Sequence, residues 1–188
     1  DASTTNNVAT IAGNASGGIY YVDSNDLEVG TVTTVGLTAA DEIAITAGGD
    51  LTVSSPIVGT TADSDISLDA DSILVNAPIS SPLALVELWA LEVGTAGIVL
   101  NDDIDAGGVG LDTYSGLQFN ADVFTNGGAL EANASDNITF SAAGKIDLEA
   151  SSTPANWPYI GLTAGLDIVM ADGSAMNARG GSVDLLAD

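Results

Sequence analysis

Residues 43–57 read Ile-Ala-Ile-Thr-Ala-Gly-Gly-Asp-Leu-Thr-Val-Ser-Ser-Pro-Ile, and residues 66–79 repeat the arrangement as Ile-Ser-Leu-Asp-Ala-Asp-Ser-Ile-Leu-Val-Asn-Ala-Pro-Ile. In both copies, alternate residues are apolar in two short runs, which is the period of a strand with one buried face. A Gly/Asp/Ser turn separates the runs, and Pro-Ile opens a third run. One copy cannot bury its own apolar face, whereas stacked copies can, so the pattern predicts a solenoid.

The same register recurs along most of the chain. Residues 19–29 align with residues 43–53 without a gap, and in both the second run begins eight residues after the first. Second runs recur at the same distance at Leu117, Ile138 and Ile168. Units open at Ile19, Ile43, Ile66, Val86, Val109, Leu130, Ile160 and Val183, at spacings of 24, 23, 20, 23, 21, 30 and 23 residues.

This period predicts an all-β protein. We expect residues 1–188 to form one right-handed parallel β-helix of about 7–8 coils of 20–24 residues, each with three short strands. No segment has the apolar spacing of a helix. Seven stacking steps of about 4.8 Å give a rod roughly 34 Å long. An antiparallel β-sandwich would explain the strands but gives no reason for a repeat kept in register.

Composition narrows the classes of function. Hydrophobic residues make up 46% of the 188, which is enough for a core. The formal net charge is −24, and Lys145 and Arg179 are the only basic residues, so nucleic acid is not an expected partner. The sequence lacks cysteine and histidine, which excludes disulfides, histidine triads and the usual zinc sites. No apolar run approaches the roughly 20 residues of a membrane span, so membrane insertion is not expected.

Three stretches, residues 43–53, 137–150 and 160–170, resemble the repeats of filamentous-haemagglutinin-type adhesins, which are large secreted bacterial proteins. The likeness is one of pattern and extends over most of residues 19–187. It implies a right-handed parallel β-helix, export from a bacterium to the cell surface or the medium, and a structural or adhesive role.

Catalytic chemistry has little support in the sequence. Lys145 and Arg179 lie in different coils, so neither is expected to act as the base of a polysaccharide lyase. Paired carboxylates such as Asp69 and Asp71 could serve a glycosidase. In so acidic a chain, turn carboxylates are more simply explained as solvated. We therefore expect no enzymatic activity and no cofactor.

Calcium is the one metal for which the sequence contains candidate ligands. The stretch Asn-Asp-Asp-Ile-Asp places Asp102, Asp103 and Asp105 in one turn, and Ca²⁺ prefers such hard oxygen ligands. Residues 107–115, which include Asp112, fit a single copy of a calcium-binding nonapeptide that normally works in tandem. A polar turn is the expected interpretation, and a calcium site is the alternative.

The aromatic residues predict contact surfaces. Trp157 and Tyr159 lie in residues 150–159, an insertion whose prolines disfavour strand pairing. These rings could anchor their own loop, contact another subunit or stack on a sugar. Trp89 and Tyr20 fall between inward positions, so both should face outward.

The two ends of the chain predict assembly. Residues 1–17, with Val8 and Ile11, look like the later part of a coil that lacks its opening strand. The last unit, with Val183 and Leu185, stops after its opening strand. Neither end shows a helical cap, so one coil could be shared between molecules joined head to tail. Both ends being cut points of a longer protein is the alternative.

Together these features predict an extracellular structural protein, a building block of a surface filament or adhesin. Its expected partner is a second copy of itself, or a glycan or protein of a host or cell surface. A carbohydrate-binding or carbohydrate-cleaving β-helix is the alternative, which requires a groove that gathers Trp157, Tyr159 and at least two carboxylates.

Overall fold

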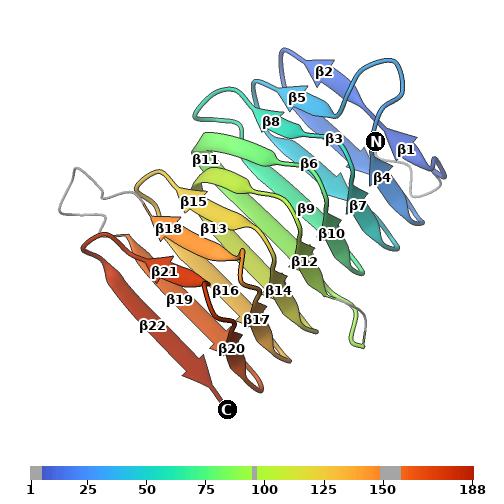
Figure 1. The fold of residues 1–188 in the computed structure, drawn as a ribbon. Coiled ribbons are helices and arrows are strands. Elements are labelled where there is room, and N and C mark those ends of the chain that lie inside the picture. The colour runs from blue at the N-terminus through green and yellow to red at the C-terminus, as the bar shows by residue number, and fades with distance from the viewer. Residues whose placement is uncertain (1–5, 95–96, 149–157) are drawn as a thin grey trace.

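The chain folds into a stack of parallel β-coils (Figure 1). The computed structural model describes residues 6–94, 97–148 and 158–188. These residues form strands and turns and no helix. Every strand-to-strand pairing among them is parallel, and the amino and carboxyl ends lie at opposite ends of the stack. The prediction of an all-β parallel solenoid is confirmed.

Each coil contributes one strand to each of three faces. The first face consists of β3 (Ile19–Val22), β6 (Ile43–Thr46), β9 (Ile66–Ala70), β16 (Leu130–Ala134), β19 (Tyr159–Ala164) and β22 (Ser182–Ala187), together with parts of β11 (Ile79–Ala90) and β13 (Ile104–Thr113). The second consists of β1 (Thr10–Ile11), β4 (Leu27–Val29), β7 (Leu51–Val53), β10 (Ile73–Val75), β12 (Ile98–Leu100), β14 (Leu117–Phe119), β17 (Ile138–Phe140) and β20 (Ile168–Met170). The third consists of β2 (Gly13–Ala15), β5 (Leu37–Ala39), β8 (Ile57–Gly59), β15 (Asp122–Thr125), β18 (Lys145–Leu148) and β21 (Ala175–Asn177), with the remaining parts of β11 and β13.

The register read from the sequence is the register of the structure. The eight predicted openings follow one another on the first face, pairing as Ile19–Ile43, Ile43–Ile66, Ile66–Val86, Val86–Val109, Val109–Leu130, Leu130–Ile160 and Ile160–Val183. The second runs stack in the same way on the second face. A one-residue slip would turn every inward side chain outward, so burial of one face sets this register.

Three local features differ from the simple repeat. β11 and β13 each run through a corner, so the third run of one coil and the first run of the next form one strand. After Val86 the second run begins at Ile98, twelve residues later instead of eight, so the chain has four additional residues at that corner. The strand after the long insertion already begins at Tyr159, which the sequence analysis assigned to the loop.

The interior is a continuous column of apolar side chains. Inward positions of all three faces are almost fully buried, as Leu51, Ile57 and Leu88 illustrate. On the second face, the rings of Phe119 and Phe140 stack with centroids 4.5 Å apart and planes 2° apart. Because the strands are in register, like side chains meet their counterparts in the coils above and below.

A second ladder, of asparagines, follows the corner between the second and third faces. The side-chain amide of Asn101 donates to the amide oxygen of Asn76 at 2.9 Å, and that of Asn120 donates to Asn101 at 2.8 Å. These bonds join three successive coils outside the core. The turns therefore share the register that the apolar interior sets.

The ring stack gives a test of the core. Phe119→Ala should lower the free energy of unfolding by about 3–5 kcal/mol, because the ring is fully buried and its removal leaves a cavity. Gln118→Ala, on the exposed side of the same strand, is the control and should change it by less than about 0.5 kcal/mol. Urea unfolding followed by circular dichroism measures both. Equal losses in the two variants would contradict the assignment of inward and outward positions.

Candidate functional site

The amino-terminal end of the stack holds an incomplete coil. β1 pairs with β4 and β2 pairs with β5, but no described strand stands before β3 on the first face. A hollow of about 460 Å³ opens at this end. Its lining is largely apolar and includes Val8, Ile11, Ile19, Tyr21, Val32 and Leu37. The two residues predicted as assembly contacts at this end, Val8 and Ile11, both line it.

Two polar side chains occupy inward positions beside the hollow. Tyr21 and Asp23 stand where the following coils have Ile45 and Ala47. Asp23 is buried, and its carboxylate accepts hydrogen bonds from the backbone N–H of Val8 at 3.1 Å and the hydroxyl of Tyr21 at 3.0 Å. These bonds hold the segment before β1 against the first complete coil.

Hydrogen bonding decides the charge state of this carboxyl group. Burial by itself raises the pKa of Asp23, but hydrogen bonds from the N–H groups of Val8 and Asn25 and from the Tyr21 hydroxyl outweigh it, so the pKa lies below its usual range. The carboxylate is therefore ionised at neutral pH and fixed at the end of the core.

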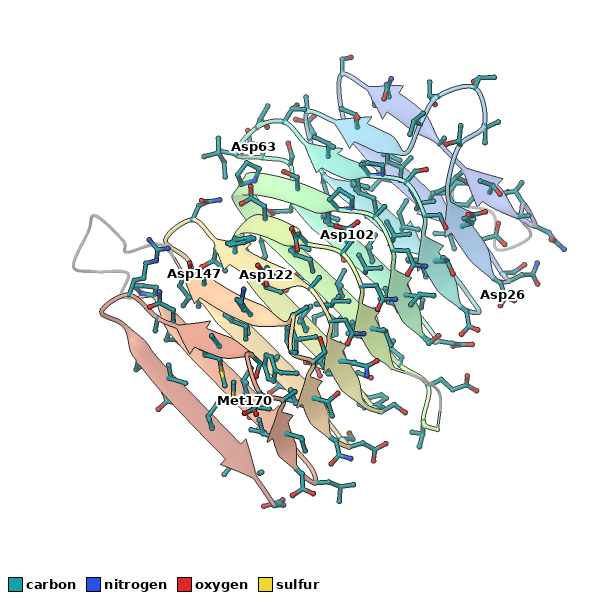
Figure 2. All side chains as sticks on the ribbon, viewed as in Figure 1. Asp26, Asp63, Asp102, Asp122, Asp147 and Met170 are labelled. Carbon is teal, nitrogen blue, oxygen red and sulfur yellow. The ribbon has the colours of Figure 1, made fainter. Side chains whose placement is uncertain are left out.

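The carboxyl-terminal end exposes apolar side chains. β22 pairs only with β19 among the described strands, and all six of its residues are exposed. Val183 and Leu185 continue the inward columns of Ile160 and Leu162, yet they are 42% and 51% exposed. Met170 of β20 also lies at this end of the stack (Figure 2). The two residues predicted as assembly contacts here, Val183 and Leu185, thus lie on an open end of the core.

The two ends hold complementary parts of one coil. The amino-terminal end has strands of the second and third faces without a first-face strand, and the carboxyl-terminal end has a first-face strand without the other two. Both expose strand edges and apolar side chains that a further parallel coil would cover.

Three of the aromatic residues singled out in the sequence, Tyr20, Trp89 and Tyr159, lie on the first face and are dispersed along it. Tyr20 is 67% exposed and Trp89 is 39% exposed, so both face outward as predicted. Tyr159 donates its hydroxyl hydrogen bond to Glu131 of the previous coil, and this bond raises the pKa of Tyr159 to about 12. Trp157 lies outside the described residues. Two coils separate the strand of Trp89 from that of Tyr159, so these two rings do not line one groove.

Carboxylates flank Trp89 on its sheet. Trp89 pairs in register with Asp69 on one side and with Asp112 on the other. Burial, and secondarily the neighbouring charge of Asp71, raises the pKa of Asp69. A flat ring between two hydrogen-bonding side chains can stack on a sugar ring and accept hydrogen bonds from its hydroxyls.

The candidate calcium ligands do not gather at one place. Asp102 and Asp103 lie at the corner before β13, Asp105 follows on the third face, and Asp112 lies on the first face. Asp103 accepts a hydrogen bond from the N–H of Asp122 at 3.0 Å, and Asp105 accepts one from the Asn126 amide at 2.8 Å. The described residues contain no group of three or more carboxylates arranged to hold a metal ion.

Other carboxylates are spread over the corners of the rod. In Figure 2, Asp26, Asp63 and Asp102 lie at well-separated points, and they belong to the corners after β3, β8 and β12 respectively. This distribution gives the sides of the rod a negative charge without concentrating it.

The one ion pair among the described residues joins neighbouring coils of the third face. Arg179 contacts Asp147 through Nε at 2.8 Å and Nη2 at 2.6 Å, and this hydrogen bonding lowers the pKa of the Asp147 carboxyl group. Lys145 begins β18 and is exposed on the same face. Arg179 thus has a structural role, because its ion pair links the last complete coil to the coil before it.

Sequence reasoning missed the hydrogen-bonded pair Tyr21–Asp23, of which Asp23 is buried, and the exposed Leu83. The repeat alignment contained a signal for the first, since Asp23 falls in a column that alanine fills in most coils. Leu83 is exposed because β11 bulges at its corner between Ser81 and Leu85.

Comparison with models of known protein families, with curated proteins and with solved structures finds no significant match. Within the described residues there is no helix long and apolar enough to cross a membrane.

The hydrogen bonds of Asp23 predict a pH dependence. Its lowered pKa means that its stabilising effect is complete above the pKa of an unfolded aspartate, about 3.9, and is lost as the pH falls through the folded-state value. Asp23→Asn should therefore be less stable than the parent at pH 7, and the difference should shrink below about pH 4.

Thermal unfolding from pH 7 to pH 2 measures this difference. Asp63→Asn, which changes an exposed carboxylate, is the control and should stay within about 0.5 kcal/mol of the parent throughout. A deficit for Asp23→Asn that is constant over the whole range would show that its carboxylate charge is not the cause.

Proposed function

We propose that this chain is an extracellular structural protein, a building block of a surface filament or adhesin that assembles head to tail through its solenoid ends. The observation that carries the proposal is the exposed first-face strand β22, whose inward-register residues Val183 and Leu185 have no covering coil among the described residues. A parallel strand edge of this kind accepts another parallel strand.

The distribution of charge favours contact through the ends. The chain has a formal net charge of −24 and two basic residues, so the sides of neighbouring rods repel each other. The apolar strand edges at the ends instead favour contact between rods, because burying them removes apolar surface from water. Rods of this kind are expected to lengthen rather than to bundle.

The placement outside the cell and the adhesive role rest on the resemblance of the repeats to filamentous-haemagglutinin-type adhesins. A parallel β-solenoid is the fold that this resemblance implies. Absence of cysteine is compatible with an exported protein that relies on stacking rather than on disulfides. In a longer polypeptide, further coils of the same chain would pair with these free edges. In a solution of the 188-residue chain, only a second copy can supply the strands that pair with them.

Carbohydrate binding is the second candidate, favoured by one observation. Trp89 is exposed between Asp69 and Asp112, which is suitable for stacking on a sugar ring. Binding of this type would be a property of the side of the rod and would be compatible with assembly through its ends.

Negative-stain electron microscopy of the purified chain, with and without millimolar calcium, tests the structural proposal. Filaments of uniform width are expected, and a requirement for calcium would show that the carboxylates at the ends or corners must be bridged or neutralised. Dispersed short rods under both conditions would contradict head-to-tail assembly.

Two substitutions on β22 provide a matched pair for this measurement. Leu185→Asp places a charge at an inward position and should abolish filaments, since it would be buried without a partner in the joint. Leu186→Asp adds the same charge at the adjacent outward position and should leave filaments intact. Equal behaviour of the two variants would argue against a joint made by the inward side of β22.

A further inference from the structure

The joint between two copies can be specified strand by strand. Beside residues 19–21 of β3 the described residues place no strand on the first face, although the coil that contains β1 and β2 needs one there. At the end of β3, Asn6 accepts hydrogen bonds from the N–H and hydroxyl of Ser24 and donates one from its side-chain amide to the carbonyl of Val22. The hollow at this end is lined by Ile11 of β1, Gly13 of β2, and Ile19 and Tyr21 of β3. A strand that completes the coil must therefore direct apolar side chains into this hollow.

β22 has the residues that this position needs. Its register with β19 places Val183, Leu185 and Ala187 in the inward columns of the first face. Continued by one step, the columns of Val183 and Leu185 reach Ile19 and Tyr21 of a following copy. The chain thus carries at one end the strand that is missing at the other.

We infer that β22 of one copy occupies the vacant first-face position beside β3 of the next copy, with Val183 in register with Ile19. The shared coil then consists of β22 from one copy and β1 and β2 from the other. This inference rests on the proposed head-to-tail assembly and identifies its partner strand and register. The contact joins different surfaces of the two copies and does not close, so it generates a filament.

The outward residues at the joint follow from the same register. Asp184 would stand beside Tyr20, and Leu186 beside Val22. Tyr20 and Asp184 are both exposed, so each can be replaced by cysteine without disturbing the core.

Disulfide cross-linking tests the register directly, since the chain contains no cysteine. In a protein carrying Tyr20→Cys and Asp184→Cys, the paired Cα atoms would lie about 4.8 Å apart, within the range that a disulfide spans. Mild oxidation should convert this variant into a ladder of covalent dimers, trimers and longer species that reduction removes. Non-reducing electrophoresis and mass spectrometry of the linked peptide detect it.

The matched control carries Tyr20→Cys and Leu186→Cys. This pair is shifted by two residues along the strand, which separates the Cα atoms by about 8 Å, beyond the reach of a disulfide. It should form filaments with little or no covalent ladder. The single variant Asp184→Cys should remain free of covalent dimers, because a dimer would indicate two β22 strands pairing with each other.

The outcomes separate this inference from the proposal on which it rests. Filaments with no ladder in the Tyr20/Asp184 variant, or with an equal ladder in the shifted variant, would overturn the register and leave head-to-tail assembly standing. Covalent dimers of the Asp184→Cys variant would overturn the register in favour of a tail-to-tail contact. Dispersed rods with no cross-linking would overturn both the register and head-to-tail assembly.

Discussion

Parallel, in-register pairing between successive coils is the constraint on which the rest of this structure depends. Each inward side chain must fit the residue above and the residue below it, so isoleucine, leucine and valine form columns and alanine fills the narrow corner. The strands of each coil likewise make their backbone hydrogen bonds with the neighbouring coils, and only turns add bonds within a coil. Each coil is therefore stabilised mainly by the coils next to it rather than by contacts within itself.

This dependence gives the two ends different characters. At the amino-terminal end, Tyr21 and Asp23 replace apolar residues of the core columns, and their hydrogen bonds hold the segment at Val8. At the carboxyl-terminal end the columns continue unchanged as Val183 and Leu185 but lack a cover. A rod with one partly polar end and one apolar end has a direction, which any assembly built from it inherits.

The sequence predicts the fold far better than it predicts the sites, for a physical reason. Openings such as Ile43, Ile66 and Val109 were identifiable because burial imposes one residue type at one spacing. The twelve-residue interval before Ile98 departs from that spacing. Residues added at a corner do not change the packing of the core, so they leave no periodic signal in the sequence. The outward direction of Trp89 could be predicted, because successive side chains of a strand point alternately inward and outward. The placement of Asp105 on a strand of the third face could not, because β13 continues as one strand through the corner at Gly107 and Gly108.

In the proposed assembly, the negative charge on the sides of the rod and the apolar strand edges at its ends both favour end-to-end contact over side-by-side contact. Repulsion between like-charged rods extends over about 8–10 Å at physiological ionic strength, whereas burial of an apolar edge acts only on contact. Two rods that approach side by side repel each other and bury no apolar edge. Two rods aligned end to end can bury apolar surface over the whole area of a coil. In the proposed head-to-tail assembly, the carboxylates scattered over the corners would have a function without binding a ligand or catalysing a reaction, because their repulsion would favour growth along the axis of the rod.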